Sequence, residues 1–189
     1  MLIDEIMPEY QVRARYYTII HAQKADVFEG LLHSVRFTDS SIIRGLVRLR
    51  ELPSKILGGG EEIVPKEPLN LSGFLEKSQF SLLGRKENEE IVLGVAGRFW
   101  DAIHPSMTKI SDLEEFKTFN EEGFGKGVMS FSLESAGEQT IISTETRVCF
   151  PAEYATRFKM YWLLIGPFSA VIRKIFLKNI KIALEKKKS

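Results

Sequence analysis

The sequence predicts one α+β domain, residues 1–189, in which a curved antiparallel sheet of six to seven strands wraps around a long C-terminal helix. Two observations predict this arrangement. Consecutive β-rich stretches between residues 74 and 149 are separated by short turn sequences, which is typical of an antiparallel meander. Residues 153–186 then carry a helical apolar stripe, which only a sheet is large enough to bury.

The N-terminal part predicts one strand and two short helices. Residues 10–22 alternate apolar and polar side chains, which predicts a half-buried strand. Apolar residues at helical spacing predict a short helix over residues 24–33. A second helix is expected to begin at a cap formed by Asp39 or Ser40 and to end at Pro53.

The middle of the chain predicts a long connection followed by the sheet. Residues 53–72 are rich in glycine and proline, and we expect a plain connection because the triple glycine lacks the Lys-Ser/Thr of a phosphate-binding loop. The strands are expected at residues 74–85, 90–99, 116–119, 128–134 and 139–149. Gly94 and Gly97 lie inside one of these strands, where glycine permits a bend of the sheet.

The C-terminal segment predicts a single long helix. Its inward stripe steps by three or four residues and consists of Phe158, Trp162, Ile165, Ser169, Ile172, Phe176 and Ile180. At 1.5 Å per residue such a helix reaches roughly 50 Å. Pro167 lacks a backbone donor, so a kink is expected there.

Composition and charge exclude several classes of function. The chain has 26 basic and 25 acidic side chains, so its net charge of +1 gives no overall field for nucleic acid. With Cys149 as the single cysteine and no signal-like N-terminus, a cytoplasmic location is expected. The longest uncharged stretch, residues 160–172, is shorter than the roughly 20 residues of a membrane span, so no transmembrane segment is expected.

Four short segments resemble one superfamily. They are IHAQKADVFEGLL at 20–32, GRFW at 97–100, TETRV at 144–148 and YWLLIGPFSAVIR at 161–173. They are similar to the START-like, or helix-grip, superfamily of polyketide cyclases and lipid-transfer domains, and in particular to an uncharacterised bacterial branch. The resemblance implies a helix-grip fold with a cavity between the sheet and the C-terminal helix. Members hold sterols, fatty acids, polyketides, quinones or hormones there. It transfers no catalytic residue and implies no cofactor.

The expected wall of that cavity is mostly aromatic. Ligand pockets are mainly apolar with a few polar groups, although the same side chains can simply fill a core. The residues expected to line the cavity are Phe80, Arg98, Trp100, Phe116, Phe131, Tyr154, Phe158, Tyr161, Trp162 and Ile165.

Three polar residues are candidates for catalysis. Glu145 and Arg147 are two apart on a predicted strand and share a face, where they either contact the cavity or form a surface ion pair of little energetic value. His104 precedes a Pro-Ser turn and is either an acid or base at the cavity mouth or an ordinary loop histidine. No histidine has metal-site spacing, so no metal is expected.

These observations leave three hypotheses for function. The first, which we favour, is a non-catalytic protein that binds or carries a hydrophobic small molecule. The second is a cyclase- or dehydratase-type enzyme acting on a polyketide-like substrate. The third is a peripheral membrane or interaction module, in which the basic side chains of the C-terminal helix contact anionic lipid instead of only complementing the helix dipole. These side chains are Arg173, Lys174, Lys178, Lys181, Lys186, Lys187 and Lys188. The identity of the ligand and the oligomeric state stay open.

Overall fold

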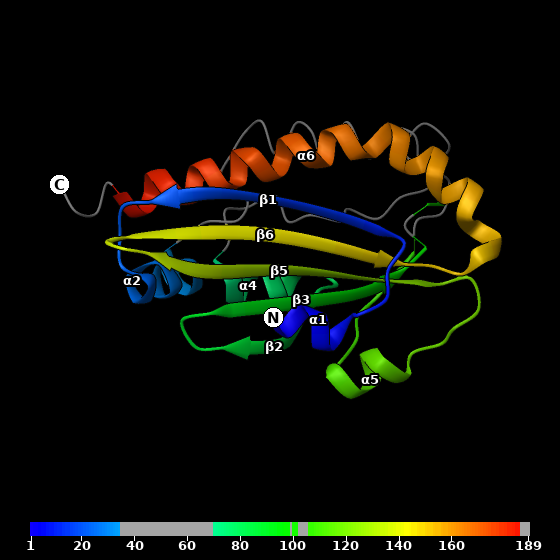
Figure 1. Cartoon of the computed structure of the whole chain (residues 1–189). Coiled ribbons are helices and arrows are strands. Elements are labelled where there is room, and N and C mark those ends of the chain that lie inside the picture. Colours follow the sequence, from blue (N-terminus) through cyan, green and yellow to red (C-terminus); the bar gives the residue numbers. More distant parts are fainter. Residues whose placement is uncertain (35–69, 99, 102–105, 186–189) are drawn as a thin grey trace.

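A computed structural model describes residues 1–34, 70–98, 100–101 and 106–185, and it shows one antiparallel sheet with a long C-terminal helix, α6 (Figure 1). The predicted α+β class is confirmed. The strands are β1 (Val12–Ile20), β2 (Ser81–Lys86), β3 (Glu90–Gly97), β4 (Met107–Thr108), β5 (Gly125–Ala136) and β6 (Gln139–Cys149). The helices are α1 (Leu2–Ile6), α2 (Lys24–Glu29), α4 (Leu71–Lys77), α5 (Leu113–Thr118) and α6 (Ala155–Glu185).

Over the described residues the sheet has six strands in the order β1-β6-β5-β3-β2, with the short β4 paired to β3. Every pairing is antiparallel, as the meander predicts. β5 and β6 form the longest hairpin, and Gly137 sits in its turn at φ +67°, a conformation that favours glycine. Strand β1, from the N-terminal part of the chain, forms one edge of the sheet and pairs with β6.

The two faces of the sheet bury different partners. Ile91, Leu93 and Phe131 alternate onto the face that packs against α6 and α2. Val92 and Ala96 point to the other face, which α1 and α5 cover. The sheet is therefore the middle layer between the long helix and two short ones.

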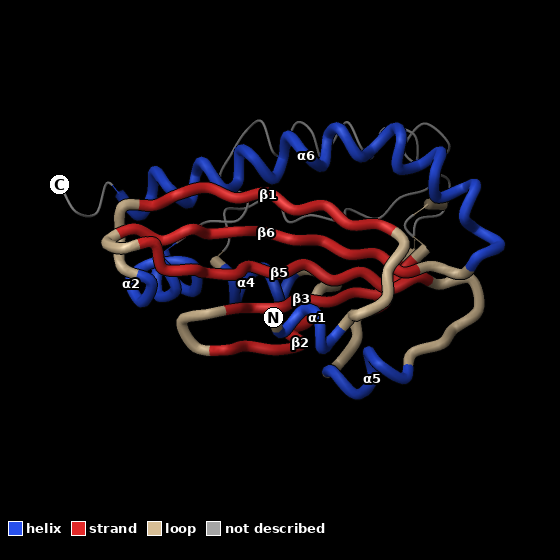
Figure 2. Tube along the Cα trace, viewed as in Figure 1, coloured by secondary structure: helices blue, strands red, loops and turns tan. Residues whose placement is uncertain are grey.

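Helix α6 runs the length of β1, and its N-terminal part bends away at the right of Figure 1 and Figure 2. The long helix predicted for residues 153–186 is confirmed over Ala155–Glu185, and a 3-10 turn (Ala152–Tyr154) precedes it. Pro167 lies inside the helix and removes one backbone hydrogen bond. The predicted inward stripe is buried at Phe158, Ile165 and Ile180, so the apolar face drives the docking of α6 onto the sheet.

One property of α6 bears on the prediction that no segment crosses a membrane. By length and composition alone, Ala152–Glu185 is long and apolar enough to cross a membrane, and it is the one such helix among the described residues. The longest uncharged stretch, residues 160–172, is shorter than this helix because Arg157 and Lys159 lie on its N-terminal side. The described ranges contain no second candidate span.

One predicted strand begins later than expected and another is wrong, because helices with capped first turns occupy residues 71–77 and 113–118. Residues 71–77 form α4, whose first turn is capped by Asn70 Oδ1 accepting from the Gly73 amide at 2.9 Å. The strand therefore starts only at Ser81. Residues 116–118 belong to α5, where Asp112 Oδ1 accepts from the Glu115 amide at 2.9 Å.

Three further elements complete the comparison with the sequence. Helix α1 and the two-residue strand β4 were not predicted. The helix expected over residues 24–33 is present as α2, continued by a π-helical turn (Gly30–Ser34). The second expected helix, from Asp39 or Ser40 to Pro53, lies outside the described residues, as does the triple glycine.

The packing of α6 predicts a contrast between its inner and outer faces. Ile180→Ala removes a fully buried side chain and is expected to lower the free energy of unfolding by about 2–5 kcal/mol. Leu163→Ala on the same helix removes a side chain that is 81% exposed and should change it by less than about 0.5 kcal/mol. Urea denaturation of both variants measures the difference, and equal losses would contradict the docking of α6 on the sheet.

Candidate functional site

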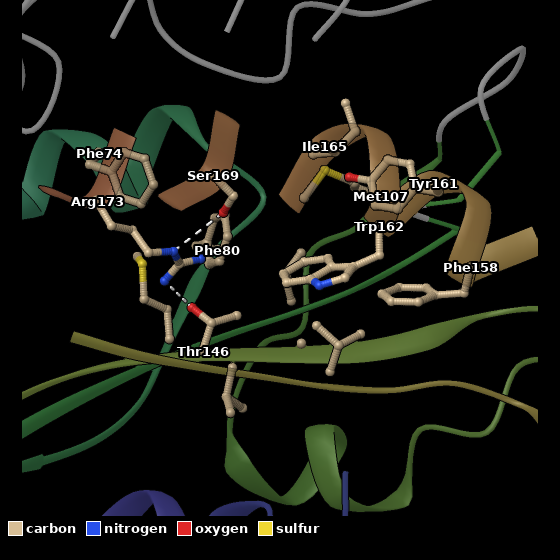
Figure 3. A pocket seen from close by; sticks show the side chains of 15 residues that line it. Phe74, Phe80, Met107, Thr146, Phe158, Tyr161, Trp162, Ile165, Ser169 and Arg173 are labelled. Atoms are coloured by element: carbon tan, nitrogen blue, oxygen red, sulfur yellow. Dashed lines mark hydrogen bonds between the residues drawn. The ribbon is translucent and has the colours of Figure 1, made fainter. Parts of the chain in front are cut away.

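A cavity of about 170 Å³ lies between the N-terminal half of α6 and the sheet (Figure 3). Helix α6 supplies one wall, with Phe158, Tyr161, Trp162, Ile165, Ser169 and Arg173. The sheet supplies the opposite wall, with Val95, Met107, Gly127, Val128, Met129, Thr146 and Val148. Phe74 of α4 and Phe80, which directly precedes β2, close the side. The lining is thus aromatic and aliphatic, with three polar side chains.

The regular periodicity of the helix and of the strand points these side chains toward the cavity. Trp162, Ile165, Ser169 and Arg173 follow one another by three or four residues, so they share one face of α6. Thr146 and Val148 are two apart on β6 and share the face toward α6. Neither group needs an unusual backbone conformation, since both positions follow from regular helix and strand geometry.

The aromatic wall is held in place by stacked rings. Phe158 lies nearly parallel to Trp162, with an interplanar angle of 17° and 6.0 Å between ring centroids. Phe150 also stacks on Phe158, with 4.1 Å between ring centroids. Behind this wall, Trp100 contacts Phe158 edge-on at 5.9 Å and stacks with Tyr154 at 5.3 Å. Such ring contacts fix the wall before any ligand arrives.

Arg173 brings a permanent positive charge to the cavity. Its guanidinium donates to Thr146 Oγ1 of β6 and to Ser169 Oγ of α6, the latter at 3.3 Å. These two bonds tie the helix to the sheet and orient the guanidinium (Figure 3). A guanidinium beside an apolar wall needs such hydrogen bonds to offset its loss of water. A carboxylate or carbonyl oxygen in the cavity would find a strong donor here.

Of the ten residues expected to line the cavity, some line it, some pack behind its wall or deeper in the core, and some lie away from it. Five line it, all on α6 or beside β2: Phe80, Phe158, Tyr161, Trp162 and Ile165. Trp100 and Tyr154 support the aromatic wall from behind. Phe131 packs on Phe176 of α6, with 5.5 Å between ring centroids, deeper in the core.

Two of the ten lie away from the cavity. Phe116 belongs to α5 and packs on the opposite face of the sheet, next to α1. This is a correction, because the residue was expected on a strand. Arg98 is exposed, with its guanidinium 4.8 Å from the centre of the Phe124 ring.

Glu145 and Arg147 also lie on the opposite face, beneath α1. They are 1% and 3% exposed, so they neither contact the cavity nor form a surface ion pair, and both alternatives are corrected. Glu145 accepts from Arg13 at 2.8 and 2.9 Å and from Arg147 Nε at 2.8 Å. Arg147 donates to Asp4 at 2.5 Å and to the Met7 carbonyl at 2.8 Å. The network therefore fastens α1 to β6.

The pKa shifts of this network have clear causes. Burial alone would raise the pKa of Glu145, but the hydrogen bonds from Arg13 and Arg147 outweigh it, and the pKa falls below its ordinary 4.5. Burial raises the pKa of Glu90, which accepts from the Leu2 amide at 2.6 Å at the start of α1. Both carboxyl groups thus hold α1 on the sheet, which is a structural role.

The remaining candidates concern histidine and metal. His104 lies outside the described residues. Within the described ranges, no three His, Cys, Asp or Glu side chains lie close enough together to hold a metal ion.

Sequence reasoning missed the polar end of the cavity. Ser169 was recognised only as a member of the inward stripe, and Arg173 was grouped with the basic side chains near the C-terminus. The available signal was their spacing, since Arg173 follows Ser169 by one helical turn. Phe74 was missed as an α4 residue because a strand was expected there.

Comparisons with known proteins give no family. No family model and no curated protein matches the chain. Two solved structures are similar over most of its length. The Thermus thermophilus protein TTHA0849 has a TM-score of 0.38 and 8% identity over 94% of this chain and 100% of that one. An uncharacterised Rhizobium leguminosarum protein has a TM-score of 0.32 and 9% identity over 93% and 99%.

The buried network predicts a pH-dependent stability difference. At pH 7, Glu145→Gln should lower the free energy of unfolding by about 3–5 kcal/mol, because two arginines lose their buried partner. The folded pKa of Glu145 is lowered, so its stabilisation is present above pH 4.5 and is lost as pH falls through the folded pKa. The difference between wild type and variant should therefore shrink in acid.

Urea denaturation between about pH 7 and pH 3 tests this expectation. The control is Glu134→Gln, which removes an exposed partner of Arg15 at 3.1 Å and should cost less than about 1 kcal/mol. A Glu145→Gln loss that is as small as the control, or that does not change with pH, would contradict the structural role of the network.

Proposed function

We propose that the protein binds a small, mainly apolar molecule with an oxygen-bearing head group in the cavity beneath α6. One observation carries this proposal: the walls are aromatic and aliphatic, and a single guanidinium, Arg173, is held at one side by Thr146 and Ser169. In Figure 3, Arg173 and Phe158 mark opposite sides of the cavity. The apolar part of the ligand would lie against Trp162 and Phe158, and its head group would face Arg173.

The physical chemistry of the cavity favours such a ligand. Burial of apolar surface stabilises the complex by roughly 25 cal/mol per Å². A carboxylate or carbonyl oxygen adds a charge-assisted hydrogen bond from Arg173. An apolar cavity of about 150 Å³ accommodates benzene, so the volume of about 170 Å³ suits one ring or a short chain.

This proposal agrees with the resemblance to START-like proteins, which implies a ligand cavity between sheet and C-terminal helix. It favours binding or carriage over catalysis. Glu145 and Arg147 serve the opposite face of the sheet. The cyclase or dehydratase hypothesis therefore loses two of its three candidate residues, Glu145 and Arg147, and the third, His104, lies outside the described residues.

The test uses the two tryptophans of the chain. In a Trp100→Phe background, Trp162 is the only tryptophan and reports directly on the cavity. Hexanoate and 1-hexanol share a chain that fits and differ in charge. The background protein should bind hexanoate about 10-fold or more tightly than 1-hexanol, since a hydrogen bond to a charged group contributes about 1.5–3 kcal/mol. Arg173→Met should abolish that preference and leave 1-hexanol binding nearly unchanged.

Two further variants separate charge from local structure. Lys174→Met removes the neighbouring, exposed cation and should keep the preference for hexanoate. Arg173→Lys keeps the charge and should retain part of it. The proposal fails if neither compound changes Trp162 fluorescence, or if hexanoate is still preferred after Arg173→Met.

A further inference from the structure

The outer face of α6 exposes large apolar side chains in its N-terminal half. Met160, Leu163 and Leu164 are 71%, 81% and 58% exposed, and Val171 is exposed further along. Met160, Leu164, Pro167 and Val171 follow one another by four, three and four residues, so they form one continuous outward row. Because the other face of α6 already packs on the sheet, the core does not need this row, and an exposed apolar row of this size marks an interaction surface.

The same outward row becomes basic in the C-terminal half of α6. Lys174, Lys178 and Lys181 continue the helical spacing and line a second cleft, of about 360 Å³, between α6 and β1. Arg15 of β1 reaches the same cleft, and Lys174 Nζ lies 6.0 Å from the centre of the Tyr16 ring.

Helix α6 has far more basic than acidic side chains. The helix carries six basic side chains against one acid, Glu185. Glu185 accepts from the His21 amide and lies 3.8 Å from Lys181, at the very end of the cleft. From Met160 to Ile182, about 33 Å, the outward row is apolar in its first half and cationic in its second, and Arg157 and Lys159 are exposed just before it.

We infer that this outer face of α6 docks the protein on an anionic membrane surface. Aliphatic side chains enter the boundary between head groups and acyl chains, and lysines contact the lipid phosphates, as in interfacial amphipathic helices. A protein partner fits less well, because lysines are depleted in protein interfaces and their cores favour aromatic side chains. The long, narrow row also suits a plane better than a compact partner patch.

Docking on the surface preserves the fold, whereas crossing the bilayer would not. The inner face of α6 is buried against the sheet at Phe176, Leu177 and Ile180. Removing α6 from the sheet would expose that core. With α6 in place, its outer face alone meets the lipid.

The docked helix would bring the bilayer next to the cavity. Met160, Leu163 and Leu164 share the same two turns as Tyr161, Trp162 and Ile165, which line the cavity from the inner side. An apolar ligand dissolved in the membrane would then have only the thickness of α6 between it and the site. This last step rests on the proposed function, but the membrane contact itself does not.

Vesicle co-sedimentation of the whole chain tests the inference. Wild type should bind vesicles of about 70% phosphatidylcholine and 30% phosphatidylglycerol, and bind pure phosphatidylcholine far more weakly. Leu163→Ser/Leu164→Ser should reduce binding at least about 10-fold. Lys174→Gln/Lys178→Gln should reduce it about 25-fold on the anionic vesicles only. The control, Ile19→Ser/Leu82→Ser, removes two exposed apolar side chains from β1 and β2 and should bind as wild type.

Three outcomes would overturn the inference. The first is no binding of wild type to anionic vesicles. The second is equal loss in the control and in the Leu163/Leu164 variant. The third is a dimer in solution that dissociates with the Leu163/Leu164 substitutions, which would make a second copy the occupant of this face. Hexanoate binding at Trp162 is measured without vesicles, so failure of the cavity proposal and failure of membrane docking are distinguishable.

Discussion

The burial of the inner face of α6 against the sheet is the constraint on which the rest of the structure depends. In the C-terminal half, Phe176, Leu177, Ile180 and Leu184 are buried and close the core against β1 and its neighbours. In the N-terminal half, before Pro167, Tyr161 and Trp162 are only partly buried, and they line the cavity together with Phe158 and Ile165. The cavity lies between this half of the helix and the sheet.

Successive side chains of β6 point to opposite faces of the sheet, so one face lines the cavity and the other holds α1. Thr146 and Val148 face the cavity, whereas Glu145 and Arg147 face α1 on the other side of the sheet. The buried charges are paired and hydrogen-bonded, as buried charges must be. The cavity itself takes its charge from Arg173 on the helix. One strand thus anchors the N-terminal helix and, through the Thr146 hydroxyl, orients the guanidinium of the site.

The parts of the fold that sequence reasoning predicted are those with long regular patterns. β1, β5, β6 and α6 each repeat their apolar period often enough to be unambiguous. α4 and α5 are short, and their caps at Asn70 and Asp112 outweigh an apolar pattern that fits a strand equally well.

The site was predicted only in part, for a physical reason. Both faces of β6 carry polar side chains, so the pattern does not tell which face meets α6, and the answer depends on the packing of α1. The aromatic wall was found because Phe158, Trp162 and Ile165 belong to the inward stripe. Arg173 was not found because its role arises from a hydroxyl on a strand 27 residues earlier in the chain.

The central claim is that the cavity holds an apolar ligand whose head group meets Arg173. A crystal structure of the protein with bound hexanoate tests it most directly. The account predicts the carboxylate about 3 Å from the Arg173 guanidinium, with the chain against Trp162 and Phe158. Hexanoate bound elsewhere, or bound in the cavity with its carboxylate turned away from Arg173, would contradict it.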